Sequence, residues 1–125
     1  MLVFISSMTM SLLQLTVLLV MLIGLSLGCS TYRAAQLYQT GTASIGTAEP
    51  TKAVADLERA VRLAPHASQI RNHLGIAYVE VGRFRDAIQA FEYAVLLDCD
   101  NSAAFQNLKW AEKYFAVVSK KEERR

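Results

Sequence analysis

The sequence contains few of the residues from which catalytic and metal sites are built. It has two histidines and two cysteines, and neither His66 nor His73 has a carboxylate or thiol at metal-ligand spacing. No glycine-rich phosphate-binding loop and no G-x-S-x-G motif occur, and no base lies near Cys99 in the sequence. We therefore expect no enzymatic activity, no cofactor and no bound metal ion.

Charged side chains are absent from residues 1–28, where Gln14 is the only strongly polar residue. A helix of about 28 residues is ~42 Å long, which exceeds the ~30 Å of bilayer hydrocarbon. This segment is therefore predicted to be a signal peptide or a membrane anchor. The whole chain has a formal net charge of +2 with both signs interspersed, so we expect no affinity for nucleic acid.

The apolar segment ends at a cysteine, in the sequence Leu25-Ser26-Leu27-Gly28-Cys29. This sequence resembles the lipobox of bacterial lipoproteins, in which a small residue precedes a cysteine that is lipidated and becomes the mature N-terminus. The resemblance implies lipidation of Cys29. It also implies a membrane-anchored protein of the bacterial cell envelope, whose remaining residues face the periplasm.

A second interpretation of the same segment remains open. No Lys or Arg precedes the apolar run, whereas a signal peptide normally begins with a positive region. Arg33 follows the run, which favours a cytoplasmic C-terminal part. The segment would then be an uncleaved inner-membrane anchor. Small and polar residues that would support its packing in lipid are Ser6, Ser7, Ser11, Thr16 and Gly24.

The remainder of the chain contains a repeated pattern. One set of residues has the spacing L-G-x2-Y…A-x3-F: Leu74, Gly75, Tyr78, Ala87 and Phe91. A shift of about 34 residues aligns Ala53 and Leu57 with Ala87 and Phe91. The pattern resembles the tetratricopeptide repeat. The resemblance implies an all-α fold, a short array of antiparallel helical hairpins with about two repeats and a capping helix, over residues 49–119.

Local signals predict where the helices of this array begin and end. Pro50 fits the first turn of a helix that runs to about residue 63, and Ser68 is predicted to cap the next helix. Gly82 is predicted to make a tight turn before a helix over residues 84–97. Asn101 or Ser102 is predicted to cap a last helix that ends near residue 119.

Two segments fit the repeat pattern poorly. Residues 29–48 are predicted to be a linker with a degenerate first helix and a flexible end, because Thr40, Gly41 and Ser44 occupy the places of Leu74, Gly75 and Tyr78; a tether without a packed helix is the alternative. Residues 120–125 mix charges and are predicted to be a disordered tail.

The resemblance also implies a groove for a protein partner, lined by the first helix of each hairpin. By register, the groove residues are Gln69, Asn72, Ile76, Val79, Glu80, Gln106, Trp110, Lys113 and Tyr114, with Tyr38 as a weaker match. We expect a partner segment with apolar anchors. In the alternative, Trp110 and Tyr114 pack against Leu37 and Tyr38 of a neighbouring helix, or against a second copy of the chain in a homodimer.

Two functions follow from these interpretations. The first is a membrane-tethered protein–protein interaction module, a scaffold that acts as adaptor or assembly factor of a bacterial envelope complex. The alternative is a bitopic inner-membrane structural subunit, with an uncleaved anchor and cytoplasmic repeats.

Overall fold

The computed structural model describes the backbone of residues 2–122 and 124, and the side chains of residues 12–24, 28–121 and 124. The described residues form helices and turns, without a strand, which confirms the predicted all-α class. The helices are α1 (Leu2–Ser44), α2 (Pro50–Leu63), α3 (Ser68–Glu80), α4 (Phe84–Leu97) and α5 (Ser102–Glu122). The chain divides into two units, residues 1–32 and residues 33–125.

The first unit consists of the apolar part of α1. The stretch Leu12–Ser44 reaches a mean hydropathy of 2.3, and no residue of its most apolar part is buried within the protein. Its leucines and valines are half to two-thirds exposed, for example Leu13 at 66% and Val20 at 68%. The helix is therefore long and apolar enough to span a membrane. The hydroxyl of Thr16 donates a hydrogen bond to the carbonyl of Leu13 at 2.8 Å, within the same helix.

Several residues of the sequence analysis have side chains outside the described set. These are Ser6, Ser7 and Ser11 of the set that would support packing of this helix in lipid, and Leu25, Ser26 and Leu27 of the lipobox-like sequence. Cys29 is described: it is exposed, with a free thiol, and lies within α1.

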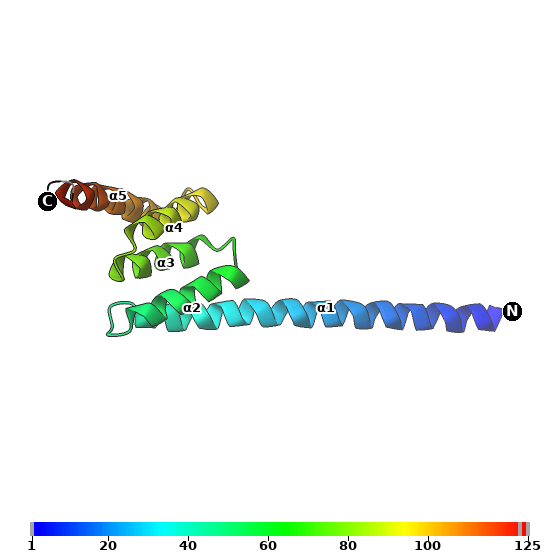
Figure 1. Cartoon of the computed structure of the whole chain (residues 1–125). Coiled ribbons are helices and arrows are strands. Elements are labelled where there is room, and N and C mark those ends of the chain that lie inside the picture. The colour runs from blue at the N-terminus through cyan, green and yellow to red at the C-terminus, as the bar shows by residue number, and fades with distance from the viewer. Residues whose placement is uncertain (1, 123, 125) are drawn as a thin grey trace. The chain divides into compact units, whose positions relative to one another are not determined.

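In the second unit α2 to α5 follow one another in space, each beside the preceding helix (Figure 1). Pro50 occupies the first turn of α2 as predicted. Gly82 adopts a φ of +76°, a conformation that favours glycine, in the turn before α4. The side chain of Asn101 accepts a hydrogen bond from the backbone N–H of Ala104 at 3.0 Å, so Asn101 is the cap of α5.

Ser68 does not cap α3, contrary to the prediction. The cap position is held by Ala67. The Ser68 hydroxyl is buried and donates to the carbonyl of Ala94 in α4, at 2.8 Å. A buried hydroxyl needs a partner, and the adjacent helix provides one. This contact between helices was not visible in the local sequence.

The helical part of residues 29–48 is longer than expected, because α1 continues to Ser44. The hydroxyls of Thr40, Thr42 and Ser44 donate to carbonyls three or four residues earlier, so they do not interrupt the helix. A Cβ at Gly41 would lie 2.7 Å from Cγ of Leu57. Glycine at this position therefore permits close approach of α1 and α2.

The end of α5 also differs from the prediction of a disordered tail over residues 120–125. The helix includes Lys120, Lys121 and Glu122. No helix-breaking residue intervenes after Ser119, and cationic side chains in a last turn interact favourably with the helix dipole. Glu123 and Arg125 lie outside the described residues.

The core of the second unit consists of two clusters of small and large apolar side chains. The first joins α2 and α3 through Ala53, Val54, Leu57, Ala60, Ile70, Leu74 and Ala77. The second joins α4 and α5 through Ala87, Phe91 and Ala111. The alanines permit close approach of the helices, and Phe91 and Leu57 are the largest fully buried side chains.

Candidate partner-binding surface

The candidate surface is formed by the odd-numbered helices, which contact one another directly. The Tyr38 ring of α1 meets the His73 ring of α3 edge-on, with centroids 5.3 Å apart. Asn107 of α5 donates a side-chain hydrogen bond to Asn72 of α3 at 2.9 Å. Residues 33–44 of α1 therefore contact α3, and α3 contacts α5.

The structure assigns different roles to the nine predicted groove residues. Asn72 is buried and links α3 to α5. Glu80 is exposed, and its carboxylate accepts a hydrogen bond from the backbone N–H of Gly46 at 2.8 Å, which ties α3 to the turn after α1. Ile76 and Val79 are half-buried against the cluster around Phe91. The remaining residues are exposed: Gln69, Gln106, Trp110, Lys113 and Tyr114.

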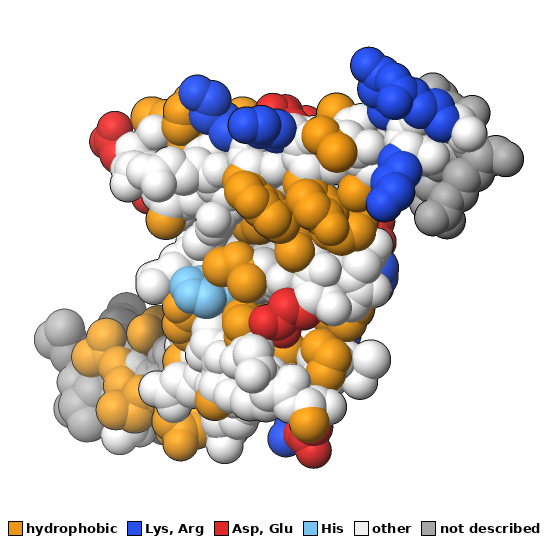
Figure 2. Space-filling view, turned by 90° about the vertical axis from the view of Figure 1, so that its left-hand side faces the viewer, with side chains coloured by type: hydrophobic (Ala, Val, Ile, Leu, Met, Phe, Trp, Pro, Cys, Tyr) orange, Lys and Arg blue, Asp and Glu red, His pale blue; other side chains and the backbone are white. Residues whose placement is uncertain are grey.

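The most prominent feature of this surface is a group of three aromatic side chains. Trp110 stacks on Tyr114 with centroids 5.2 Å apart and ring planes 12° apart. Tyr114 in turn contacts Phe84, the first residue of α4, at 5.1 Å. Trp110 is 51% and Tyr114 44% exposed. Figure 2 shows hydrophobic side chains gathered across the upper half of one face of the molecule.

This aromatic group differs from one sequence-based interpretation, the packing of Trp110 and Tyr114 on Leu37 and Tyr38. Their ring contacts are with each other and with Phe84, whereas Tyr38 contacts His73. The predicted packing of this pair on Tyr38 is therefore not what the described residues show. Phe84 was missed as a surface residue, because its place at a helix start gave no indication that it lies beside α5.

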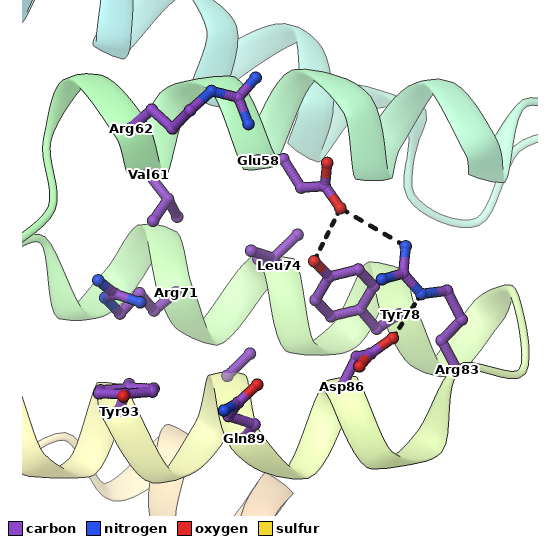
Figure 3. A pocket seen from close by; sticks show the side chains of 11 residues that line it. Glu58, Val61, Arg62, Arg71, Leu74, Tyr78, Arg83, Asp86, Gln89 and Tyr93 are labelled. Carbon is purple, nitrogen blue, oxygen red and sulfur yellow. Dashed lines mark hydrogen bonds and ion pairs between the residues drawn. The ribbon is translucent and has the colours of Figure 1, made fainter.

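A network of charged and hydrogen-bonded groups joins α2, α3 and α4 (Figure 3). The Tyr78 hydroxyl donates to Glu58 at 2.8 Å, and Arg83 pairs with Glu58 at 3.5 Å and with Asp86 at 2.6 Å. Burial, followed by the neighbouring Glu58 carboxylate, raises the pKa of Tyr78 to about 12. The hydrogen bond to Asp86 raises the pKa of Arg83. These groups hold the helices together.

The described residues contain no group of three or more His, Cys, Asp or Glu side chains placed to hold a metal ion. The thiol of Cys99 is free and exposed at the turn between α4 and α5. Comparison of the chain with protein-family models and with curated proteins gives no match.

Proposed function

We propose that the protein is a membrane-tethered protein–protein interaction module, an adaptor or assembly factor of a bacterial envelope complex. The observation that carries this proposal is the half-exposed, stacked pair of Trp110 and Tyr114, which packs through Tyr114 on the partly buried Phe84. Aromatic side chains that are packed on one side and open on the other are enriched among residues that dominate binding energy. The partner would place an apolar anchor on this group.

A recurring contact supports a tetratricopeptide-like array of antiparallel hairpins. A Cβ at Gly41 would meet Leu57, and a Cβ at Gly75 would meet Phe91. Both glycines and both large residues are separated by 34 positions in the sequence, which is about the length of the repeat. We infer that α1 with α2, and α3 with α4, form two equivalent hairpins, and that α5 is the capping helix.

In the structure, α5 presents an apolar face that α2, α3 and α4 leave exposed. Exposed apolar side chains on α5 include Trp110, Tyr114 and Val117, the last at 62% exposure. A protein partner, or a second copy of the chain, would cover this face. This is the physical reason for a function in binding.

The tether is proposed to be a lipid on Cys29, with the helical array in the periplasm. One observation favours the alternative of an uncleaved bitopic anchor: Cys29 lies within α1, and the residues on both sides of it are helical. The intact mass of the protein extracted from bacterial membranes distinguishes the two, with Cys29→Ala as control. Loss of residues 1–28 with addition of lipid indicates a lipoprotein, whereas a full-length mass indicates the anchor.

The partner surface is tested by photo-crosslinking in living cells. A photoreactive amino acid at position 110 or 114 is expected to give a specific crosslinked product, identified by mass spectrometry. The matched control is position 105, because Phe105 is also an aromatic residue of α5 and is 49% exposed, but its ring contacts Lys109 instead of the aromatic group. A crosslink to a second copy of the chain would identify a homodimer.

A second measurement tests the energetics of the same surface. Trp110→Ala combined with Tyr114→Ala should abolish capture of the crosslinked partner while circular dichroism remains unchanged, because central aromatic residues contribute ~2 kcal/mol or more to an interface. Equal products from positions 105 and 110, or unchanged capture by the double variant, would remove this surface from the proposal.

A further inference from the structure

A second surface of the protein is a cleft between α2 and α4, with α3 at its base (Figure 3). Its volume is about 410 Å³, near the lower end of the ~300–1,000 Å³ that is typical of ligand pockets. Three arginines and two carboxylates line it, an excess of one positive charge. The aromatic group of Trp110, Tyr114 and Phe84 is not part of this lining.

The negative charges of the cleft are already engaged at one end. Glu58 accepts from Tyr78 and pairs with Arg83, and Asp86 pairs with the same arginine at 2.6 Å. The guanidinium of Arg83 also lies over the Tyr78 ring, 4.3 Å from its centroid. Arg83 is thus committed to its own chain and, with the two carboxylates, leaves one negative charge at this end, whereas Arg62 and Arg71 carry two positive charges; the whole lining has an excess of one positive charge.

Arg71 is held in place at the other end of the cleft without a carboxylate partner. Its Nε donates to the carbonyl of Pro65 at 3.1 Å, and its guanidinium carbon lies 5.0 Å from the centroid of the Tyr93 ring. These contacts fix the plane of the guanidinium. Among the described residues neither Arg71 nor Arg62 of α2 forms an ion pair.

The surroundings of these arginines select the class of ligand. A guanidinium presents two parallel N–H donors that match a carboxylate. The excess of a single positive charge suits one carboxylate better than a doubly charged phosphate. Val61 and the half-exposed ring of Tyr93 provide an adjacent apolar surface, and the volume admits a few amino-acid side chains but not the acyl chains of a lipid.

We propose that this cleft binds an acidic segment of a partner protein, with an Asp or Glu carboxylate at Arg71 and a neighbouring aliphatic side chain on Val61 and Tyr93. Arg62, on the opposite wall of the cleft, adds positive charge that attracts the same segment (Figure 3). The site goes beyond the proposed function of the α5 surface and does not depend on it. A protein with both surfaces holds two partner segments at once, one through aromatic contacts and one through charge.

The test uses the full-length protein in phosphatidylcholine nanodiscs and a synthetic pool of short peptides. Half of the pool has Asp or Glu at its centre and half has Asn or Gln, with randomised flanking residues in both. Retained peptides are quantified by mass spectrometry. We expect the acidic peptides to be enriched about tenfold over the amides, since a charge-assisted bidentate contact is about twice as strong as a neutral one.

Three substitutions assign the enrichment to the cleft. Arg71→Lys should remove most of it, because lysine keeps the charge but lacks the planar fork. Arg62→Gln should reduce it, because this change removes the other unpaired positive charge of the cleft. Arg59→Gln is the matched control: it removes the same charge from α2, at an exposed position outside the cleft. Circular dichroism checks that each variant is folded. Arg71 donates a hydrogen bond to the carbonyl of Pro65, whereas Arg62→Gln removes no such hydrogen bond and is the variant less prone to disturb the fold.

Several results would overturn the proposal. One is equal retention of acidic and amide peptides, and another is an equal effect of Arg59→Gln and Arg62→Gln, which would indicate a general electrostatic field. A third is binding to phosphatidylglycerol nanodiscs that depends on Arg62, without peptide enrichment, which would assign the site to a lipid headgroup. Trp110→Ala with Tyr114→Ala should leave the enrichment unchanged, so failure of the α5 surface and failure of the cleft are distinguishable.

Discussion

Replacement of Gly75 by alanine should destabilise the helical domain, although alanine is the better helix former. A Cβ at position 75 would lie 2.6 Å from Cδ1 and 2.8 Å from Cζ of Phe91. Phe91 is 1% exposed and is packed in a cluster with Ala87 and Ala111. The ring therefore cannot move away without displacing another buried group.

Two opposing contributions determine the size of the effect. A glycine to alanine change in a helix interior stabilises by ~1 kcal/mol, whereas an additional group in a packed core costs ~1–3 kcal/mol. Three atoms of the Phe91 ring lie within 3.0 Å of the added Cβ, so the cost at Gly75 belongs at the upper end of its range. We expect a net loss of ~1–2 kcal/mol in the free energy of unfolding.

Thermal unfolding of the full chain in detergent micelles measures this loss. Trp110 is the single tryptophan of the chain and lies on α5, so its fluorescence reports the helical domain and not the apolar part of α1. Each kcal/mol should lower Tm by ~4–8 °C in a domain of this size.

The control for this prediction is the same substitution in a Phe91→Leu background. Leucine removes the ring, so Gly75→Ala should there be neutral or stabilising by up to ~1 kcal/mol. An increase of Tm for Gly75→Ala in the native background would refute the close packing of α3 against α4.

Two further predictions concern the polar contacts between helices. Tyr78→Phe removes the hydroxyl that donates to Glu58 and should cost about 1 kcal/mol of stability. The pKa of Tyr78 is raised from 10.0 to about 12 in the folded state, so the contribution of its neutral hydroxyl to stability is complete below pH 10 and is lost as the pH rises toward 12. Between pH 10 and 12, the Tm of Tyr78→Phe should therefore decrease less with pH than the Tm of the native protein. Asn101→Ala removes the cap of α5 and a hydrogen bond to Ser68 and should cost ~1–2 kcal/mol, whereas Asn101→Asp keeps the cap and should lose less. Equal unfolding midpoints for the two Asn101 variants in urea would show that the cap contributes nothing.

Most of the helix boundaries could be predicted from the sequence, because the signals that set them are local. Pro50 fits only a first helical turn, Gly82 permits a positive φ, and Asn101 reaches the N–H of Ala104 within its own turn. The apolar stripe that contains Leu57 and its counterpart in α4 has helical spacing in the sequence. None of these inferences requires knowledge of a neighbouring helix.

Predictions that depended on a neighbouring helix were less complete. Serine is a residue type that favours helix caps, but the hydroxyl of Ser68 donates its hydrogen bond to the carbonyl of Ala94 in α4. Gly41 reads locally as a helix breaker, yet it is the position at which Leu57 approaches α1. Phe84 belongs to the aromatic surface because α4 begins beside Tyr114.

The candidate surfaces show the same division. Register placed Trp110 and Tyr114 in a partner groove, which stays a prediction; that the two rings stack on each other and are half-exposed came from the structure. Register did not indicate that the side chain of Asn72 accepts a hydrogen bond from Asn107 of α5. The cleft that contains Arg71 was not foreseen, since its walls come from three helices separated in the sequence.

The sequence by itself determined that this chain is helical, that its first segment is apolar enough to span a membrane, where α2 and α4 begin and end, and where α5 begins. These properties depend on hydrophobic periodicity and on contacts within one turn of helix. The tertiary structure decided which hydroxyls and amides link the helices, which aromatic side chains meet on α5, and which arginines remain without a carboxylate partner. Such outcomes depend on the rotation and approach of helices distant in sequence, which close packing of side chains such as Phe91 against Gly75 selects.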